Sequence, residues 1–90
     1  MTLRKDAIYS GRVQGVGFRA TVLHIARKYR VTGFVRNRPD GTVELIVEGE
    51  EPEVEALLAV VREHFTRNLT GESSHGSEPR GEFTGFEIRS

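Results

Sequence analysis

A glycine-rich turn near the start of the sequence combines residue types that bind anions. It reads Ser-Gly-Arg-Val-Gln-Gly-Val-Gly-Phe-Arg from Ser10 to Arg19. Glycines allow a sharp turn and let a ligand approach the backbone closely. A turn that opens a helix also offers unpaired N–H groups to an anion, with the helix dipole behind them. Because the guanidinium of Arg19 is permanently charged and matches the geometry of phosphate, the turn predicts an anion site. The alternative is an ordinary strand-to-helix turn with a surface arginine.

Two nucleotide-binding patterns do not fit this turn. Gly15 to Ala20 matches Gly-x-Gly-x-x-Ala, and Asp40 follows at a suitable distance. Ninety residues, however, cannot build the doubly wound sheet of a dinucleotide fold, and Asp40 falls in a predicted hairpin turn. No Lys-Ser or Lys-Thr pair follows the glycines, which excludes a nucleotide P-loop.

The hydrophobic pattern predicts the elements that must position the turn. Alternation predicts strands at 7–13, 31–37, 42–49 and 83–89, and a poor edge strand at 68–73 before a mobile loop. A helical period predicts helices at 19–30 and 52–65, and Pro39-Asp40-Gly41 predicts a hairpin turn. This order predicts an α+β sandwich of the ferredoxin-like split βαβ kind. Two helices would lie on one face of a mostly antiparallel four- to five-stranded sheet.

The apolar positions of the two predicted helices fall on one stripe of each. They are Val22, Ile25, Ala26 and Tyr29 on the first helix, and Val54, Leu57, Leu58, Val61 and Phe65 on the second. These stripes, and Val43, Leu45 and Val47 on the third strand, predict the core.

Length and composition narrow the class of protein. Residues 1–90 are predicted to form a single domain. No run of about eighteen apolar residues is present, and the first residues lack the apolar segment of a signal peptide, so we expect a cytoplasmic protein without a membrane partner. Residues 1–38 carry nine Lys or Arg and one acid, whereas 39–90 carry four Arg and twelve acids, so net charges of +8 and −8 cancel. The basic half would favour anions at the turn, unless folding mixes the charges.

Few other residues suggest chemistry. His24, His64 and His75 are scattered, and we expect His24 to face solvent. No metal-ligand cluster, acid–base pair of carboxylates or cysteine is present, so neither a metal nor a cofactor is predicted. Asn37 ends the second predicted strand, which can lie near the turn. Its amide could hold a water molecule, or it could merely start the hairpin.

Four ordered motifs resemble acylphosphatases over nearly the whole chain. They are Gly11-Arg12-Val13-Gln14-Gly15-Val16-Gly17-Phe18-Arg19, Gly33-Phe34-Val35-Arg36-Asn37, Asp40-Gly41-Thr42-Val43-Glu44 and Gly85-Phe86-Glu87-Ile88. The resemblance implies a ferredoxin-like fold and hydrolysis of small-molecule acyl phosphates to carboxylate and inorganic phosphate. Because Arg19 and the amides could position and stabilise the phosphoryl group themselves, we expect this hydrolysis to be metal-independent. Segment 66–82 departs from the family, which usually has a patterned, apolar strand there.

The same resemblance assigns roles to individual residues. It makes Arg19 the phosphate-binding catalytic arginine and Asn37 the residue that positions the attacking water. It makes a phosphate cradle of the backbone amides of Gln14, Gly15, Val16, Gly17 and Phe18. A monomer is the expected state.

Two other functions fit parts of the sequence. A non-catalytic relative would bind phosphate without turnover, although the presence of both Arg19 and Asn37 argues against it. An RNA-binding domain would need aromatic side chains exposed on the central strands, for which Tyr9 and Phe34 are the candidates. The balanced net charge argues against nucleic acid.

Overall fold

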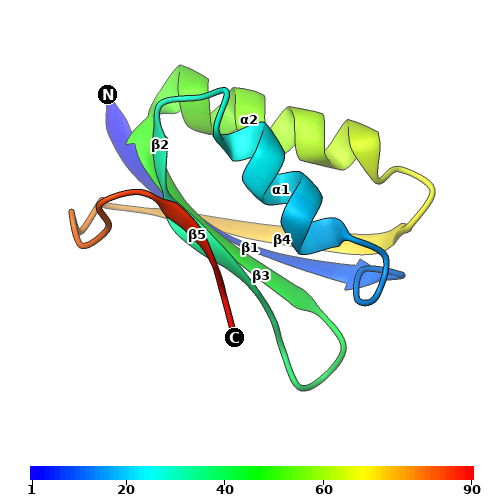
Figure 1. Ribbon diagram of the computed structural model, residues 1–90. Coiled ribbons are helices and arrows are strands. Elements are labelled where there is room, and N and C mark those ends of the chain that lie inside the picture. The colour runs from blue at the N-terminus through cyan, green and yellow to red at the C-terminus, as the bar shows by residue number, and fades with distance from the viewer.

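A computed structural model describes residues 1–90 as a sheet covered on one face by two helices (Figure 1). The elements in chain order are β1 (Thr2–Gly11), α1 (Phe18–Ala26), β2 (Val31–Asn37), β3 (Val43–Glu50), α2 (Glu51–His64), β4 (Leu69–Ser77) and β5 (Phe86–Arg89). The predicted ferredoxin-like α+β arrangement is confirmed. Neither helix is long and apolar enough to cross a membrane.

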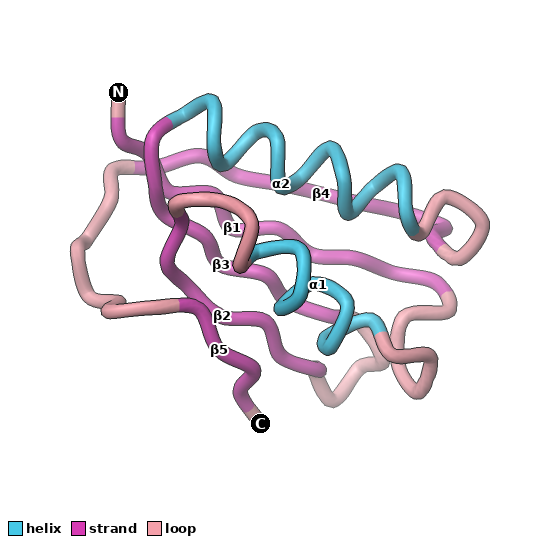
Figure 2. Tube along the Cα trace, turned by 45° about the horizontal axis from the view of Figure 1, so that its top comes forward, coloured by secondary structure: helices cyan, strands magenta, loops and turns pink.

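The strands form one five-stranded sheet in the order β4-β1-β3-β2-β5 (Figure 2). β1 pairs antiparallel with β3 and β4, and β2 pairs antiparallel with β3. β5 pairs parallel with β2, with Ile88 opposite Val35. β1 and β2 therefore run in the same direction. The glycine-rich turn after β1 and the hairpin after β2 thus lie at the same end of the sheet.

The core fills the space between the sheet and the helices. Alternate residues of the central strands face the helices, which is why Ala7, Tyr9, Val35, Leu45 and Val47 are all fully buried. The predicted helix stripes are buried as expected, except that Tyr29 is only partly covered. Glu51 and Glu53 occupy the first turn of α2, where the helix dipole favours acids.

Several predicted boundaries were wrong. α1 ends at Ala26 rather than at residue 30 because the N–H groups of Lys28 and Tyr29 donate to carbonyls three residues back, which tightens the chain into a turn. β1 begins at Thr2 rather than at residue 7, although Arg4 and Lys5 are charged.

The two edge strands also differ from their predicted limits. β4 extends to Ser77 rather than ending at residue 73, because it follows the longer β1 as far as the pair Arg4 and Ser77. β5 begins at Phe86 rather than at residue 83.

A buried carboxylate fixes the segment between β4 and β5 on the sheet face opposite the helices. The Glu48 side chain is only 5% exposed. It accepts hydrogen bonds from the backbone N–H groups of Arg80 and Gly81, both at 3.0 Å, and from Arg4 Nη1 at 3.2 Å. Arg4 also donates to Glu82 at 2.9 Å. Segment 78–85 is thereby tied to the centre of the sheet.

Glu48 should make the stability of the protein depend on pH. Burial opposes ionisation of Glu48, but the two N–H donors and Arg4 outweigh it and lower the pKa of the carboxyl group. Its stabilising contribution is therefore complete above the ordinary pKa of about 4 and disappears as the pH falls through the lower folded-state value. We expect Glu48→Gln to reduce the free energy of unfolding at pH 7 by about 3 kcal/mol.

Urea denaturation at pH 7, 5 and 3 measures this contribution. The gap between wild type and Glu48→Gln should stay constant from pH 7 to pH 5 and narrow towards pH 3, because the contribution of the Glu48 charge falls once the pH is below the ordinary pKa of the carboxyl group. Glu87→Gln is the matched control, because Glu87 is an exposed acid on β5. A gap that stays constant with pH would contradict the assigned role of the Glu48 charge.

Candidate active site

The glycine-rich turn is fixed at its start by Asn68. Gly11 ends β1 with a φ of +116°, and a Cβ at this position would lie 2.3 Å from the Asn68 carbonyl oxygen. This close approach lets the Arg12 N–H donate to that carbonyl at 2.9 Å, while Asn68 Nδ2 donates to the Arg12 carbonyl at 3.1 Å. The two hydrogen bonds determine where the turn leaves the sheet.

Phe18 fixes the other end of the turn in the core. Gly17 precedes α1 in the left-handed region, with φ at +79°, a conformation that glycine adopts at little cost. The Phe18 side chain is then 1% exposed, and its ring centroid lies 5.2 Å from that of Tyr9 and 4.4 Å from that of Phe65. Aromatic packing therefore holds the first residue of α1, while the next residue, Arg19, remains at the surface.

The backbone amides of the turn have no partners within the chain. None of the N–H groups from Gln14 to Ala20 donates a hydrogen bond to another protein group. The first turn of α1 contains no acidic residue that would compete for them. The start of the helix thus offers several donors, and the positive end of its dipole, to an anion.

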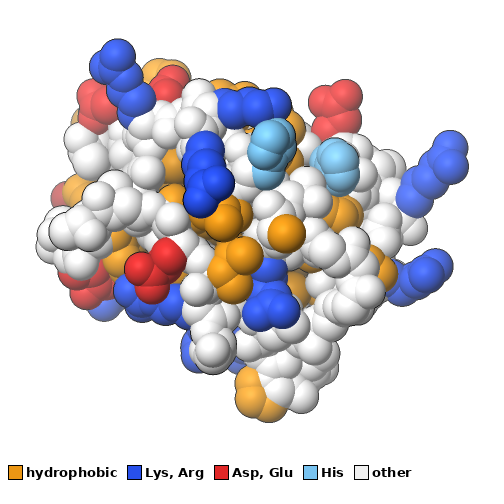
Figure 3. All heavy atoms as spheres, in the orientation of Figure 1, with side chains coloured by type: hydrophobic (Ala, Val, Ile, Leu, Met, Phe, Trp, Pro, Cys, Tyr) orange, Lys and Arg blue, Asp and Glu red, His pale blue; other side chains and the backbone are white.

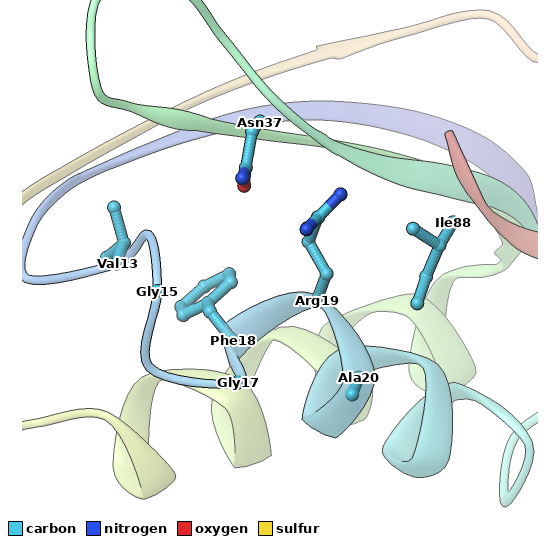
Figure 4. Close-up of a pocket in the computed structure, with 8 residues that line it drawn as sticks. All are labelled: Val13, Gly15, Gly17, Phe18, Arg19, Ala20, Asn37 and Ile88. Atoms are coloured by element: carbon cyan, nitrogen blue, oxygen red, sulfur yellow. The ribbon is translucent and has the colours of Figure 1, made fainter. Parts of the chain in front are cut away.

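Arg19 and Asn37 face one pocket beside these amides (Figure 4). The pocket has a volume of about 210 Å³, and its eight lining residues are Val13, Gly15, Gly17, Phe18, Arg19, Ala20, Asn37 and Ile88. Arg19 extends from α1 and Asn37 from β2 into the same space. Arg19 forms no ion pair within the chain, and no acidic residue lines the pocket.

The alternation of β2 explains the direction of Asn37. Val35 is fully buried beneath the helices, and Asn37, two residues later, lies on the same face. The Asn37 Oδ1 atom is buried and has no hydrogen-bond partner. A buried polar atom without a partner is costly, which suggests that it binds a ligand or a water molecule.

Gln14 connects the turn to the hairpin that follows Asn37. Its side-chain Nε2 donates to the carbonyl oxygens of Arg38 at 2.8 Å and Thr42 at 2.9 Å. The hairpin is itself closed by a hydrogen bond from the Arg38 N–H to the Thr42 carbonyl and by Asp40, which accepts from the Thr42 N–H at 3.0 Å. The hydrogen bonds that the Thr42 hydroxyl and N–H donate to Asp40 lower the pKa of its carboxyl group, so this group stays ionised. These contacts set the position of the turn relative to Asn37.

Most of the predicted site residues meet at the pocket. Gly15, Gly17, Phe18, Arg19 and Asn37 line it, whereas Gln14 and Val16 do not.

Sequence reasoning missed three lining residues: Val13, Ala20 and Ile88. The alternation of β5 puts Ile88 on the same inward face as Phe86, which packs against the core, but it does not give the strand beside which β5 lies.

Folding partly mixes the two oppositely charged halves of the sequence. Arg4, Lys5 and Arg36 from the basic half pair with Glu48, Glu55 and Glu44 from the acidic half. Arg19 is left unpaired. The positive charge at the pocket therefore comes from this arginine and the amides rather than from the net charge of the first half.

The remaining candidate groups lie away from the pocket. His24 is exposed, as expected, and so are His64 and His75. No group of three or more His, Asp or Glu side chains is arranged to hold a metal ion.

The aromatic side chains proposed for RNA are not available for stacking on bases. Tyr9 is fully buried, and burial raises its pKa well above the ordinary value. The Arg89 guanidinium covers Phe34, at 4.3 Å from the ring centroid.

Comparison with known proteins identifies the family. Residues 5–88 match the model of the family Acylphosphatase. Acylphosphatases of Methylococcus capsulatus and Haloarcula marismortui are 42% and 41% identical to this chain over 86 and 87 residues, covering 94% and 96% of it and 94% of each relative. A match to an acylphosphatase of Acidiphilium cryptum, at 52% identity over 60 residues, spans 67% of this chain and 66% of that relative.

Solved structures of acylphosphatases are also similar to this chain. The acylphosphatase of Bacillus subtilis superposes with a TM-score of 0.87 at 33% identity, covering 98% of this chain and 99% of that one. An acylphosphatase from Coxiella burnetii superposes with a TM-score of 0.84 at 26% identity, and the match covers 98% of this chain and 93% of that one. The resemblance in the sequence motifs is thus confirmed, and the chain belongs to the acylphosphatase family of acyl phosphate hydrolases.

Proposed function

We propose that this acylphosphatase works without a metal. Arg19 and the turn amides hold the phosphoryl group, and Asn37 holds the attacking water. The observation that carries the proposal is the buried, unpartnered Oδ1 atom of Asn37, which faces the pocket lined by Arg19 and the turn. Membership of the family supports the reaction, and the arrangement of these groups supports their roles.

The phosphoryl group would bind at the start of α1. Its non-bridging oxygens would accept hydrogen bonds from the N–H groups between Gln14 and Phe18, and the Arg19 guanidinium would pair with two of them. Charge on these oxygens is distributed over the group in the transition state, where fixed donors and a cation stabilise it. Because the turn is held by Asn68, Phe18 and Gln14, little reorganisation is needed when the phosphoryl group binds.

The attacking water would be held by Asn37. Its Oδ1 atom accepts a hydrogen bond from the water and so directs the oxygen lone pair towards phosphorus. Holding water and phosphoryl group together replaces an encounter in solution by a reaction within one complex. No protein base is assigned to this step.

The leaving group explains why so few groups suffice. The water oxygen forms a bond to phosphorus while the bond from phosphorus to the acyl oxygen breaks, and the electron pair leaves on the carboxylate. A carboxylate is a good leaving group and needs no strong general acid. In this proposal the water proton passes to a phosphate oxygen, which yields inorganic phosphate.

Hydrolysis of benzoyl phosphate by the purified protein tests the proposal. We expect turnover in the presence of a chelator, at the rate measured without it. Phosphate binding without turnover would favour the non-catalytic alternative, and loss of activity in the chelator would contradict the metal-independent mechanism.

The proposal assigns catalysis to Arg19, Asn37 and the turn amides, and it adds that the enzyme acts as a monomer on small-molecule acyl phosphates. The cytoplasmic location stays a prediction from the sequence.

A further inference from the structure

Ile88 forms the wall of the pocket that lies away from the glycine-rich turn. It comes from β5, where it lies opposite Val35 and therefore faces the helix layer. In Figure 4 the turn and Ile88 are on opposite sides of Arg19, and the Ile88 side chain extends towards the pocket. The pocket thus has one side made of backbone amides and another made of an aliphatic side chain.

Ile88 is more exposed than expected for a residue on the sheet face that packs against the helices. It is 39% exposed and lies outside the buried core cluster, although α1 packs against β5. Hydrophobic side chains reach the surface between α1 and β5 (Figure 3). Apolar surface in a pocket favours an apolar ligand, because binding removes that surface from water.

The charges of the pocket point to the same class of ligand. Arg19 is the only charged residue among the eight that line it, and the phosphoryl group would use that charge. A second anionic group on the substrate would find no cation of its own in the lining. Ala20 and Ile88 instead offer methyl and methylene groups next to Arg19.

We propose that Ile88 is a specificity-determining residue that contacts the acyl group, so that the enzyme prefers acyl phosphates with apolar aryl or branched acyl groups. The inference rests on the proposed function, because it places the acyl group where the phosphoryl group at the turn would direct it. Acyl groups too short to reach Ile88 gain nothing from it.

Two substrates and three variants test this preference. Ile88→Ala should lower kcat/KM for benzoyl phosphate about tenfold, while kcat/KM for acetyl phosphate changes less than about twofold. Competitive inhibition by inorganic phosphate should not change, because Ile88 lies away from the turn. Ile88→Val should retain most of the preference, and Val60→Ala is the matched control, since Val60 is 36% exposed on α2 and does not line the pocket.

The outcomes separate this inference from the proposed function. If wild type hydrolyses both substrates but Ile88→Ala lowers both equally, or weakens phosphate inhibition, the inference is wrong and the proposed function stands. If wild type hydrolyses neither substrate, both are wrong. Thermal unfolding of Ile88→Ala should match that of Ile88→Val, which excludes a general loss of structure as the cause.

Discussion

Replacing Arg19 with alanine is expected to lower kcat/KM for benzoyl phosphate by roughly 10³- to 10⁵-fold, the range that an arginine contributes to phosphoryl transfer. The substitution removes the only charged side chain from the pocket. It leaves the turn amides in place, but these carry only partial charges. Competitive inhibition by inorganic phosphate should weaken in parallel, because the guanidinium would bind product as well as transition state.

Arg27→Ala is the matched control for this prediction. Arg27 is an exposed arginine at the end of the same helix and does not line the pocket. It should keep near wild-type kinetics. If Arg19→Ala retained more than about a tenth of wild-type kcat/KM, charge stabilisation by Arg19 could not be a main source of catalysis.

Replacing Asn37 with alanine is expected to lower kcat by about 10²- to 10³-fold while phosphate still binds. The substitution removes the Oδ1 atom that would hold the water, but the turn amides and Arg19 remain. The inhibition constant of inorganic phosphate should therefore stay within about threefold of wild type, which distinguishes this variant from Arg19→Ala.

Thr32→Ala provides the comparison on the same strand, because Thr32 lies on β2 away from the pocket. Its kinetics should match those of wild type. A rise in the phosphate inhibition constant of Asn37→Ala as large as its loss of kcat/KM would mean that Asn37 binds phosphate rather than water. Removal of Asn37 Oδ1 breaks no hydrogen bond within the protein, so it should not reduce the free energy of unfolding.

The side of the candidate site formed by the glycine-rich turn could be predicted because it is local in sequence. The glycines, Phe18 and Arg19 are consecutive or nearly so, and a single strand-to-helix connection positions them. To predict that Asn37 lies near the turn, one must also know that β1 and β2 are parallel. The order of elements indicates this direction.

Ile88 could not be placed in the same way. Its position depends on β5 joining the sheet beside β2 rather than at the other edge. The alternation of a short strand gives the face on which a side chain lies but not the neighbour with which the strand pairs.

Two of the boundary errors, at the start of β1 and the end of α1, have a common physical origin. Arg4 and Glu48 are charged residues that pair with one another in the buried part of the structure, so hydrophobic alternation gave no sign that β1 begins at Thr2. The last turn of α1 ended early through local hydrogen bonds rather than through a glycine or proline. In both places contacts between polar groups, which sequence patterns do not show, decided the outcome.

The polar sequence of β4 has a consequence for the behaviour of the folded protein in concentrated solution. β4 is at the edge of the sheet, so the backbone groups on its outer side have no strand beside them. Such an edge is a template on which a second copy can add a strand and begin aggregation. The exposed part of β4, Ser73 to Ser77, contains only serine, histidine and glycine. A copy that paired there would gain backbone hydrogen bonds but would bury almost no apolar surface, so the strand that looked weakest in the sequence makes this edge of the sheet a poor template for a second copy.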